Sequence, residues 1–159
     1  MKIAIIDYEI GNVKSILNAF KKIGIEPILT NDREAILSSD GLILPGVGAF
    51  AHGMENLKKY GLKEIIYEFV NTQKPFMGIC LGMQMLMEES EEFGKTKGLG
   101  LIEGKVIKLP VQNPNYEKLP HVSWNEISTK NISSKNTILD DIEEHSDMYF
   151  VHSYIVLPK

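Results

Sequence analysis

The only cysteine of the chain stands between two glycines, in the segment GICLG at residues 78–82. An apolar run typical of a buried strand enters this segment, and a helix-forming run, Met83–Glu89, leaves it. A strand, a sharp turn and a helix around a G-x-nucleophile-x-G pattern predict a nucleophile elbow, in which the flanking positions have no room for side chains. The elbow lifts the sulfur of Cys80 over the end of a sheet, where a thiolate can attack a substrate. The alternative is a buried cysteine in a glycine-rich turn.

Short apolar runs and amphipathic stretches alternate along the first eighty residues. The candidate strands of the chain are Lys2–Asp7, Pro27–Thr30, Gly41–Leu44, Phe76–Ile79, Lys105–Leu109, Trp124–Ile127 and Tyr149–Val156. Apolar strands that alternate with helices predict a parallel sheet covered on both faces. Ligands bind such sheets at the carboxyl ends of the strands, where Cys80 and the turn Pro45–Gly48 both fall. No linker interrupts the chain, although Pro110–Pro120 reads as a long loop, so we expect one domain.

Bulk properties exclude several classes of function. The 159 residues carry a formal net charge of −4, which leaves no excess of positive charge to neutralise nucleic-acid phosphates. A single cysteine excludes an internal disulfide and favours a reducing compartment. No apolar run has the length of a signal peptide or a membrane span, so we expect a cytoplasmic protein without a membrane partner. The acidic residues near position 142 lack the spacing of metal ligands, and we expect no metal ion and no cofactor.

A sulfur nucleophile needs donors for the oxyanion and a proton shuttle. The backbone N–H of Leu81, directly after the nucleophile, is one expected donor. A second donor could come from the turn PGVG at Pro45–Gly48, whose glycines let its backbone approach a substrate. The alternative is that PGVG is only a loop that ends a strand. For the shuttle the chain offers His52, His121, His145 and His152. Spacing alone favours His152, although a histidine in a strand is more often a packing residue.

Six segments occur in an order that resembles a known family. They are DY and GN at residues 7–8 and 11–12, PGVGAF at 45–50, GICLGMQ at 78–84, GLGLIEG at 98–104, PHVSWN at 120–125 and FVHSY at 150–154. Together they resemble the glutamine amidotransferase subunit of imidazole glycerol phosphate synthase, which is a class-I, triad-type amidotransferase. GICLGMQ is shared by many class-I amidotransferases, and the other segments narrow the resemblance to this branch. The resemblance covers essentially the whole chain.

This resemblance implies a fold, a reaction and a partner. The fold is α/β, a flavodoxin-like three-layer sandwich with a mostly parallel central sheet. The reaction is hydrolysis of L-glutamine through a cysteinyl thioester. Ammonia then passes to a (β/α)₈-barrel synthase subunit, which forms imidazole glycerol phosphate and aminoimidazole carboxamide ribotide in histidine biosynthesis. The two subunits are expected to form a heterodimer.

The resemblance also assigns roles to residues. Cys80 is the nucleophile, and Val47 and Leu81 supply the backbone N–H groups for the oxyanion. The positions that match substrate-binding residues are Gly46, Gly48, Gln84, His152, Ser153 and Tyr154, which makes His152 a pocket residue rather than the base. The positions that match the partner interface are Asn12, His121, Trp124 and Asn125.

Two features depart from the family pattern. The family has its catalytic base and orienting carboxylate in a late His-Pro-Glu motif, whereas this chain contains no His-x-Glu and ends at Lys159. We therefore expect residues 1–159 to be one amidotransferase domain that is incomplete at its C-terminus, with little activity as it stands, because losing a triad member costs several orders of magnitude. The second departure is Ser123, which stands where the family usually has glycine.

These departures leave other functions open. One is a paralogous amidotransferase subunit that feeds ammonia to a sugar-modifying synthase of surface polysaccharide. Another is a binding module without catalysis, if the native chain stops at Lys159. A third is a cysteine-elbow hydrolase on a similar sheet, and the segments PGVGAF and FVHSY argue against it.

Overall fold

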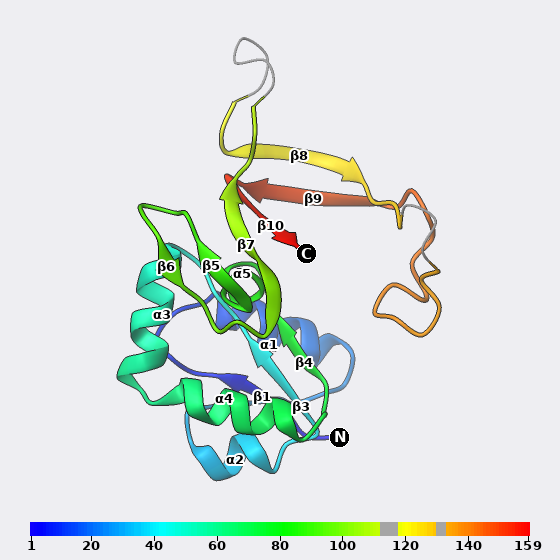
Figure 1. Cartoon of the computed structure of the whole chain (residues 1–159). Helices are drawn as coiled ribbons and strands as arrows, with labels where there is room; N and C mark the ends of the chain where they lie inside the picture. The colour runs from blue at the N-terminus through cyan, green and yellow to red at the C-terminus, as the bar shows by residue number, and fades with distance from the viewer. Residues whose placement is uncertain (112–117, 130–132) are drawn as a thin grey trace. The chain divides into compact units, whose positions relative to one another are not determined.

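The computed structural model describes residues 1–111, 118–129 and 133–159, and these divide into two compact units (Figure 1). The first unit comprises Met1–Lys108 and Val156–Lys159, and the second comprises Leu109–Ile155. Residues 112–117 of the predicted loop Pro110–Pro120 lie outside the described residues. Each unit is described below by itself.

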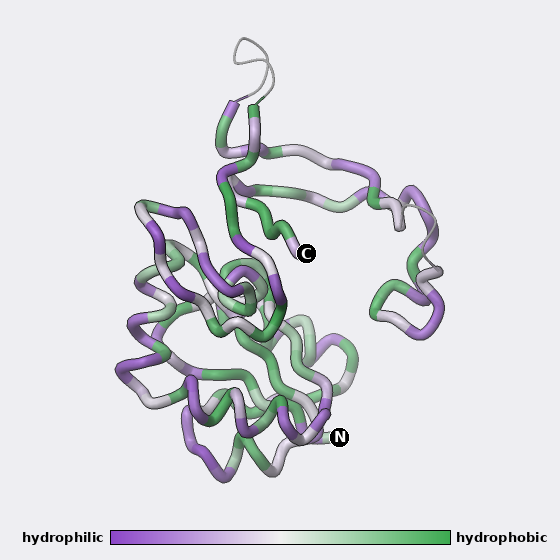
Figure 2. The backbone as a smooth tube through the Cα atoms, viewed as in Figure 1, coloured by the Kyte–Doolittle hydropathy of each residue, from purple (hydrophilic) through white to green (hydrophobic). Residues whose placement is uncertain are grey.

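A four-stranded parallel sheet forms the centre of the first unit. Its strands are β1 (Ile3–Ile6), β2 (Ile28–Thr30), β3 (Gly41–Leu44) and β4 (Phe76–Gly78). They lie in the order β2-β1-β3-β4, which is how a flavodoxin-like sheet begins. Figure 2 shows hydrophobic residues concentrated in the central strands. All four strands predicted in this region are confirmed, and so is the α/β fold with a mostly parallel central sheet.

Helices cover both faces of this sheet (Figure 1). They are α1 (Val13–Lys22), α2 (Arg33–Leu37), α3 (Phe50–Lys59) and α4 (Leu62–Asn71). The apolar side of α1 packs against Ile3, Ile5 and Ile43, while α4 packs against α2 and against α3 on the opposite face. The side chain of Asp32 accepts a hydrogen bond from the N–H of Ala35 and so caps α2. Among the described residues, no helix has both the length and the apolar character needed to cross a membrane.

The segment after Cys80 corrects one prediction. Helix α5 spans only Leu81–Met85, and Met87–Ser90 forms strand β5 instead of extending the helix to Glu89. β5 pairs with β6 (Thr96–Lys97) and with β7 (Ile102–Lys108), in a sheet whose order is β10-β7-β5-β6. Met87 and Ser90 are buried by this pairing. Sheet pairing thus prevails over the local helix propensity of the segment.

The second unit is built on a two-stranded antiparallel ribbon. Its strands are β8 (His121–Glu126) and β9 (Asp147–His152), in a register that places His121 opposite His152 and Trp124 opposite Tyr149. The predicted strand Tyr149–Val156 therefore divides at Ser153 into β9 and β10 (Tyr154–Pro158).

Candidate active site at Cys80

Cys80 occupies the turn between strand β4 and helix α5, and its backbone is strained. Its φ is +55° and its ψ is −116°, a region that residues with a side chain rarely adopt. Such a conformation costs about 1–3 kcal/mol and persists where the surrounding structure enforces it, often at a reacting residue. The side chain of Cys80 is exposed. The elbow predicted from the sequence is therefore present as a geometry, with its sulfur open to a substrate.

Two close contacts explain the glycines that flank Cys80. A Cβ on Gly78 would lie 2.5 Å from the backbone nitrogen of Met83, and a Cβ on Gly82 would lie 1.9 Å from the carbonyl oxygen of Leu44. Both atoms belong to backbone that the sheet and helix hold in place. Any side chain at either position would displace strand β3 or helix α5.

The PGVG turn lies directly against this elbow. It follows β3, whose last residue, Leu44, accepts a hydrogen bond from the N–H of Ile79 at 2.9 Å. A Cβ on Gly46 would lie 2.7 Å from the nitrogen of Gly82 and 2.8 Å from the Cβ of Leu81, so this glycine allows the turn to touch the first turn of α5. The loop after one strand and the nucleophile after the next thus meet at the carboxyl edge of the sheet.

Backbone donors are available at this contact. No described residue accepts a hydrogen bond from the N–H of Val47 or from that of Leu81. Val47 is 49% exposed, and Gly48 after it has a φ of +91°. Gln84 stands four residues after Cys80, at the start of α5. In a helix this spacing places two side chains on the same side. The arrangement can bring two N–H donors and an exposed thiol to one acyl group, which is the layout of acyl transfer.

Tyr8 and Asn56 hold the beginning of the turn through two hydrogen bonds. The hydroxyl of Tyr8, which is fully buried, donates to the carbonyl oxygen of Pro45 at 2.5 Å. The side-chain amide of Asn56, on α3, donates to the carbonyl oxygen of Tyr8 at 2.9 Å. Burial raises the pKa of Tyr8 well above its ordinary value, and the nearby Cys80 raises it further. The phenol therefore stays protonated and remains a donor.

Glu92 holds the other end of the turn. Its carboxylate accepts a hydrogen bond from the N–H of Phe50 at 2.7 Å, at the first residue of α3. Neither Tyr8 nor Glu92 is predicted from the sequence to have a role at this site. Tyr8 belongs to DY, one of the six segments that resemble the family, and this resemblance could have identified it. Glu92 lies 42 residues from its partner, Phe50, and no local sequence pattern predicts this contact.

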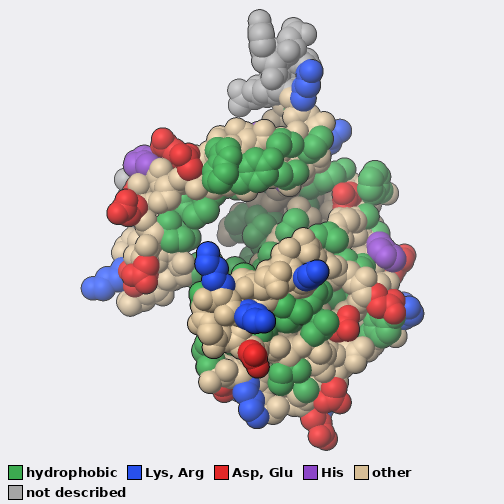
Figure 3. Space-filling view, turned by 180° about the vertical axis from the view of Figure 1, so that it is seen from behind, with side chains coloured by type: hydrophobic (Ala, Val, Ile, Leu, Met, Phe, Trp, Pro, Cys, Tyr) green, Lys and Arg blue, Asp and Glu red, His purple; other side chains and the backbone are tan. Residues whose placement is uncertain are grey.

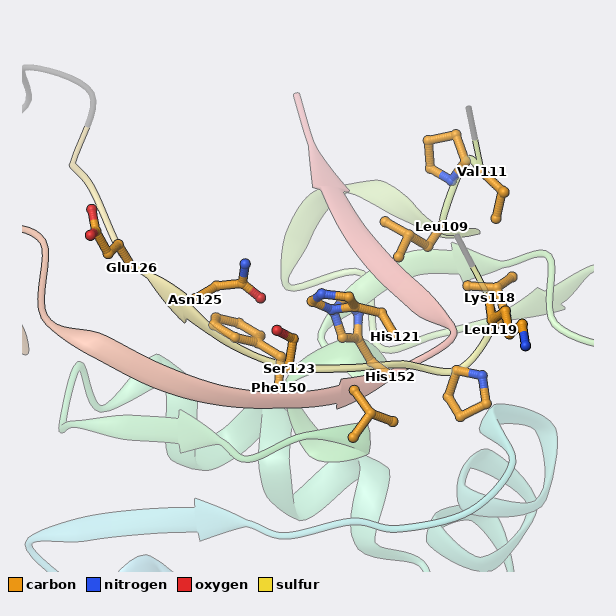
Figure 4. A pocket seen from close by; sticks show the side chains of 13 residues that line it. Leu109, Val111, Lys118, Leu119, His121, Ser123, Asn125, Glu126, Phe150 and His152 are labelled. Carbon is orange, nitrogen blue, oxygen red and sulfur yellow. The ribbon is translucent and has the colours of Figure 1, made fainter. Parts of the chain in front are cut away.

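The remaining predicted residues lie elsewhere. Asn12 is exposed at the start of α1 in the first unit, and the others belong to the second unit. There His121 Nδ1 lies 3.1 Å from His152 Nε2, and His152 Nδ1 lies 3.1 Å from the carbonyl oxygen of Tyr154. The two imidazoles lie side by side in a cavity of about 780 Å³, together with Ser123, Asn125 and Phe150 (Figure 4). Cys80 is not among the residues that line it. The contact of His152, Ser153 and Tyr154 with glutamine stays a prediction.

The opposite side of the ribbon carries four exposed apolar residues. The rings of Trp124 and Tyr149 lie 5.4 Å apart, and each is more than half exposed. Val122 and Val151, the next pair on the same side of the ribbon, are also more than half exposed. We call these four residues the ribbon face, and Figure 3 shows hydrophobic side chains gathered over this ribbon.

Comparisons with known proteins agree on one family. Glutamine amidotransferase class-I matches residues 4–159. Imidazole glycerol phosphate synthase subunit HisH of Sulfurimonas denitrificans is 46% identical over 156 residues, which are 98% of this chain and 73% of that protein. Subunit HisH 2 of the same synthase from Methanococcus maripaludis is 49% identical over 156 residues, 98% of this chain and 74% of its own length.

Solved structures support the fold. A glutamine amidotransferase crystal structure matches with a TM-score of 0.68 and 17% identity, and the match covers 97% of this chain and 72% of the other. PurLQS from Thermotoga maritima matches with a TM-score of 0.65 and 18% identity, over 99% of this chain and 69% of the other. At these identities the likeness concerns the fold alone, whereas the HisH sequences match at much higher identity over nearly the whole chain. The chain therefore belongs to the class-I glutamine amidotransferases, in the branch of the imidazole glycerol phosphate synthase subunit HisH.

Proposed function

We propose that this chain is the glutaminase subunit of an imidazole glycerol phosphate synthase and that Cys80 is its nucleophile. One observation carries the assignment of the site. The strained elbow at Cys80 touches the PGVG turn at Gly46, the residue before Val47, which supports the proposal that the backbone N–H groups of Val47 and Leu81 serve the same exposed thiol. The two HisH relatives, at 46% and 49% identity, are subunits of imidazole glycerol phosphate synthase, and the family resemblance stated above implies glutamine hydrolysis in histidine biosynthesis.

The reaction begins with attack of the Cys80 thiolate on the side-chain amide carbon of L-glutamine. The carbonyl oxygen becomes an oxyanion and accepts hydrogen bonds from the N–H groups of Val47 and Leu81. When the tetrahedral intermediate collapses, the carbon–nitrogen bond breaks and the nitrogen takes up a proton to leave as ammonia. Water then attacks the thioester, which releases L-glutamate and regenerates the thiolate.

Protonation of the departing nitrogen needs a general acid. The family resemblance places that group in a His-Pro-Glu motif, and residues 1–159 contain no His-x-Glu. The residues of the chain thus account for nucleophilic attack and for stabilisation of the oxyanion.

Glutamine is proposed to lie over the elbow. Gly48 is exposed, with open space around its Cβ position, and leaves that part of the turn open to the substrate. Gly46, Gln84, His152, Ser153 and Tyr154 are proposed to bind glutamine as well, on the family resemblance stated above. A few fixed donors and acceptors in a narrow site are enough to bind a small polar substrate such as glutamine.

The ribbon face is proposed to contact the synthase subunit, expected to be a (β/α)₈ barrel, in a heterodimer. Exposed aromatic pairs are typical anchors of protein interfaces, because they bury a large apolar area on few rotatable bonds. Trp124 and Tyr149 form such a pair. Asn12, His121 and Asn125 are proposed to lie at or near contacts with the synthase, on the family resemblance stated above. The HisH relatives are subunits of imidazole glycerol phosphate synthase and do not favour the sugar-modifying alternative.

Release of L-glutamate tests this function. The full-length native protein is assayed with L-glutamine, alone and with the synthase subunit and its nucleotide acceptor, beside its Cys80→Ala variant. We expect slow release by the protein alone, faster release in the complete complex, and none above background in the variant. Release that persists after Cys80→Ala would refute the assignment of the nucleophile. Release by neither protein under any of these conditions would refute the function.

A further inference from the structure

Tyr8 makes one of the most buried polar contacts in the first unit, directly beneath the active-site turn. It lies two residues after the end of β1, and its side chain is fully buried. Its hydroxyl donates to the carbonyl oxygen of Pro45 at 2.5 Å, across 37 residues of sequence. A phenol and a peptide carbonyl buried together satisfy each other, and removing the hydroxyl would leave the carbonyl unpaired.

The acceptor of this bond fixes the geometry of the turn. The Pro45 carbonyl belongs to the peptide plane between Pro45 and Gly46, and the proline ring already restricts the rotation that precedes it. Gly46, by contrast, has no intrinsic preference that would hold the next peptide, which carries the Val47 N–H. Holding the first plane therefore limits the directions in which the Val47 N–H can point.

Packing around Gly46 completes the restraint. The position of a Cβ on Gly46 lies 2.7 Å from the nitrogen of Gly82 and 3.0 Å from the hydroxyl oxygen of Tyr8. Gly46 is thus enclosed between the elbow on one side and the phenol on the other. A rotation of the turn has to move one of these two neighbours.

Tyr8 is itself anchored. The side-chain amide of Asn56, a buried residue of α3, donates to the backbone carbonyl oxygen of Tyr8 at 2.9 Å. Two hydrogen bonds in series thus run from α3 through Tyr8 to Pro45. Because the phenol stays protonated, this connection persists at any pH at which a thiolate enzyme works.

We propose that Tyr8 is a positioning residue for glutamine hydrolysis, which holds the Pro45–Gly48 turn so that the Val47 N–H points at the oxyanion. This role rests on the proposed function. It differs from a purely structural role in one respect: it acts on the step that develops an oxyanion and leaves the nucleophilicity of Cys80 unchanged.

The test compares Tyr8→Phe with Tyr67→Phe, both in complex with the synthase subunit. Tyr67 is a matched control, because its hydroxyl also donates to a backbone carbonyl oxygen, that of Leu99, at 2.8 Å in the same unit but outside the turn and the elbow. Two rates are measured for each protein. One is kcat for glutamine hydrolysis, and the other is alkylation of Cys80 by iodoacetamide, a displacement that forms no oxyanion.

For Tyr8→Phe we expect kcat to fall by about tenfold with little change in KM, which is less than the loss of a whole oxyanion donor. The alkylation rate should match that of the wild type, and Tyr67→Phe should match it in both rates. An unchanged kcat in Tyr8→Phe would overturn the positioning role alone. Equal falls in kcat and in alkylation would also overturn it, because they would indicate a loosened elbow. A wild type without hydrolysis dependent on Cys80 would overturn the proposed function, and the positioning role with it.

Discussion

Gly82 lies so close to Leu44 that a Cβ on Gly82 would stand 1.9 Å from the carbonyl oxygen of Leu44. Leu44 ends the strand that leads into the PGVG turn, and Gly82 lies in the helix that leads away from Cys80. This contact fixes the elbow against the strand that leads into the turn. The proposed nucleophile and its proposed backbone donors thus depend on the absence of a single methyl group at Gly82.

The substitution Gly82→Ala is expected to unfold the first unit or to displace α5, with a loss of stability above about 4 kcal/mol, because the new methyl group meets backbone. The control is Gly24→Ala, at a glycine with a φ of +77° and open space around its Cβ position. That variant should lose about 1–2 kcal/mol from backbone conformation alone. Urea denaturation measures both losses. Similar values for the two variants would contradict the close contact.

The backbone conformation of Cys80 is predicted to lower the free energy of unfolding. Its φ of +55° favours glycine, so Cys80→Gly should unfold at higher urea concentration than Cys80→Ala, by about 1 kcal/mol in free energy. Both variants should lack glutaminase activity. This comparison separates the strain from the loss of the sulfur, since alanine removes the sulfur and keeps the strain. Equal stability of the two variants would show that the elbow is unstrained.

Tyr8 is predicted to make stability depend on pH in the alkaline range. Its pKa is raised in the folded protein, first by burial and then by Cys80, whereas the unfolded chain ionises near pH 10. Its contribution is fully present below pH 10. Above pH 10 the unfolded state loses the proton while the folded state keeps it, so stability falls by up to about 1.4 kcal/mol per pH unit.

The variant Tyr8→Phe isolates this effect. At pH 8 it should be less stable than the wild type by about 1 kcal/mol, because the Pro45 carbonyl loses its donor. By pH 11 the difference should shrink or change sign, since the variant has no phenol to ionise. Chemical denaturation at the two pH values measures it. A difference that stays constant would mean that the pKa of Tyr8 is not raised.

Trp124 is predicted to be a principal contact with the synthase subunit. Replacing it by alanine should weaken binding by about 2 kcal/mol, or about thirtyfold, because an aromatic anchor of the ribbon face is lost. Ile138, which is 80% exposed in the same unit and outside the ribbon face, provides the control. Ile138→Ala should bind as the wild type does in titration calorimetry. Equal affinities for both variants would exclude the ribbon face from the interface.

Local patterns were sufficient to predict most of the first unit. Strands β1 to β4 are short and apolar, α1 has its apolar residues at helical spacing, and the cap of α2 is a single residue, Asp32. The elbow was predictable for the same reason, because Gly78, Cys80 and Gly82 form a pattern that spans five residues of the sequence. Strand β5 was not, since its residues favour a helix locally and take strand form only by pairing with β7.

Long-range contacts of the site escaped prediction. The bond from Tyr8 to Pro45 spans 37 residues and that from Phe50 to Glu92 spans 42. Neither depends on a spacing that the sequence displays. Such contacts become visible only when the sheet brings the ends of its strands together.

Covalent trapping of the nucleophile is the most direct test of a glutamine site at the Cys80 elbow. The protein, in complex with its synthase subunit, is treated with 6-diazo-5-oxo-L-norleucine, a reactive analogue of glutamine, and the labelled peptides are identified by mass spectrometry. We expect a single adduct on Cys80, which excess L-glutamine suppresses and Cys80→Ala abolishes. Labelling that excess L-glutamine leaves unchanged, or that appears on another residue, would contradict a glutamine site at this elbow.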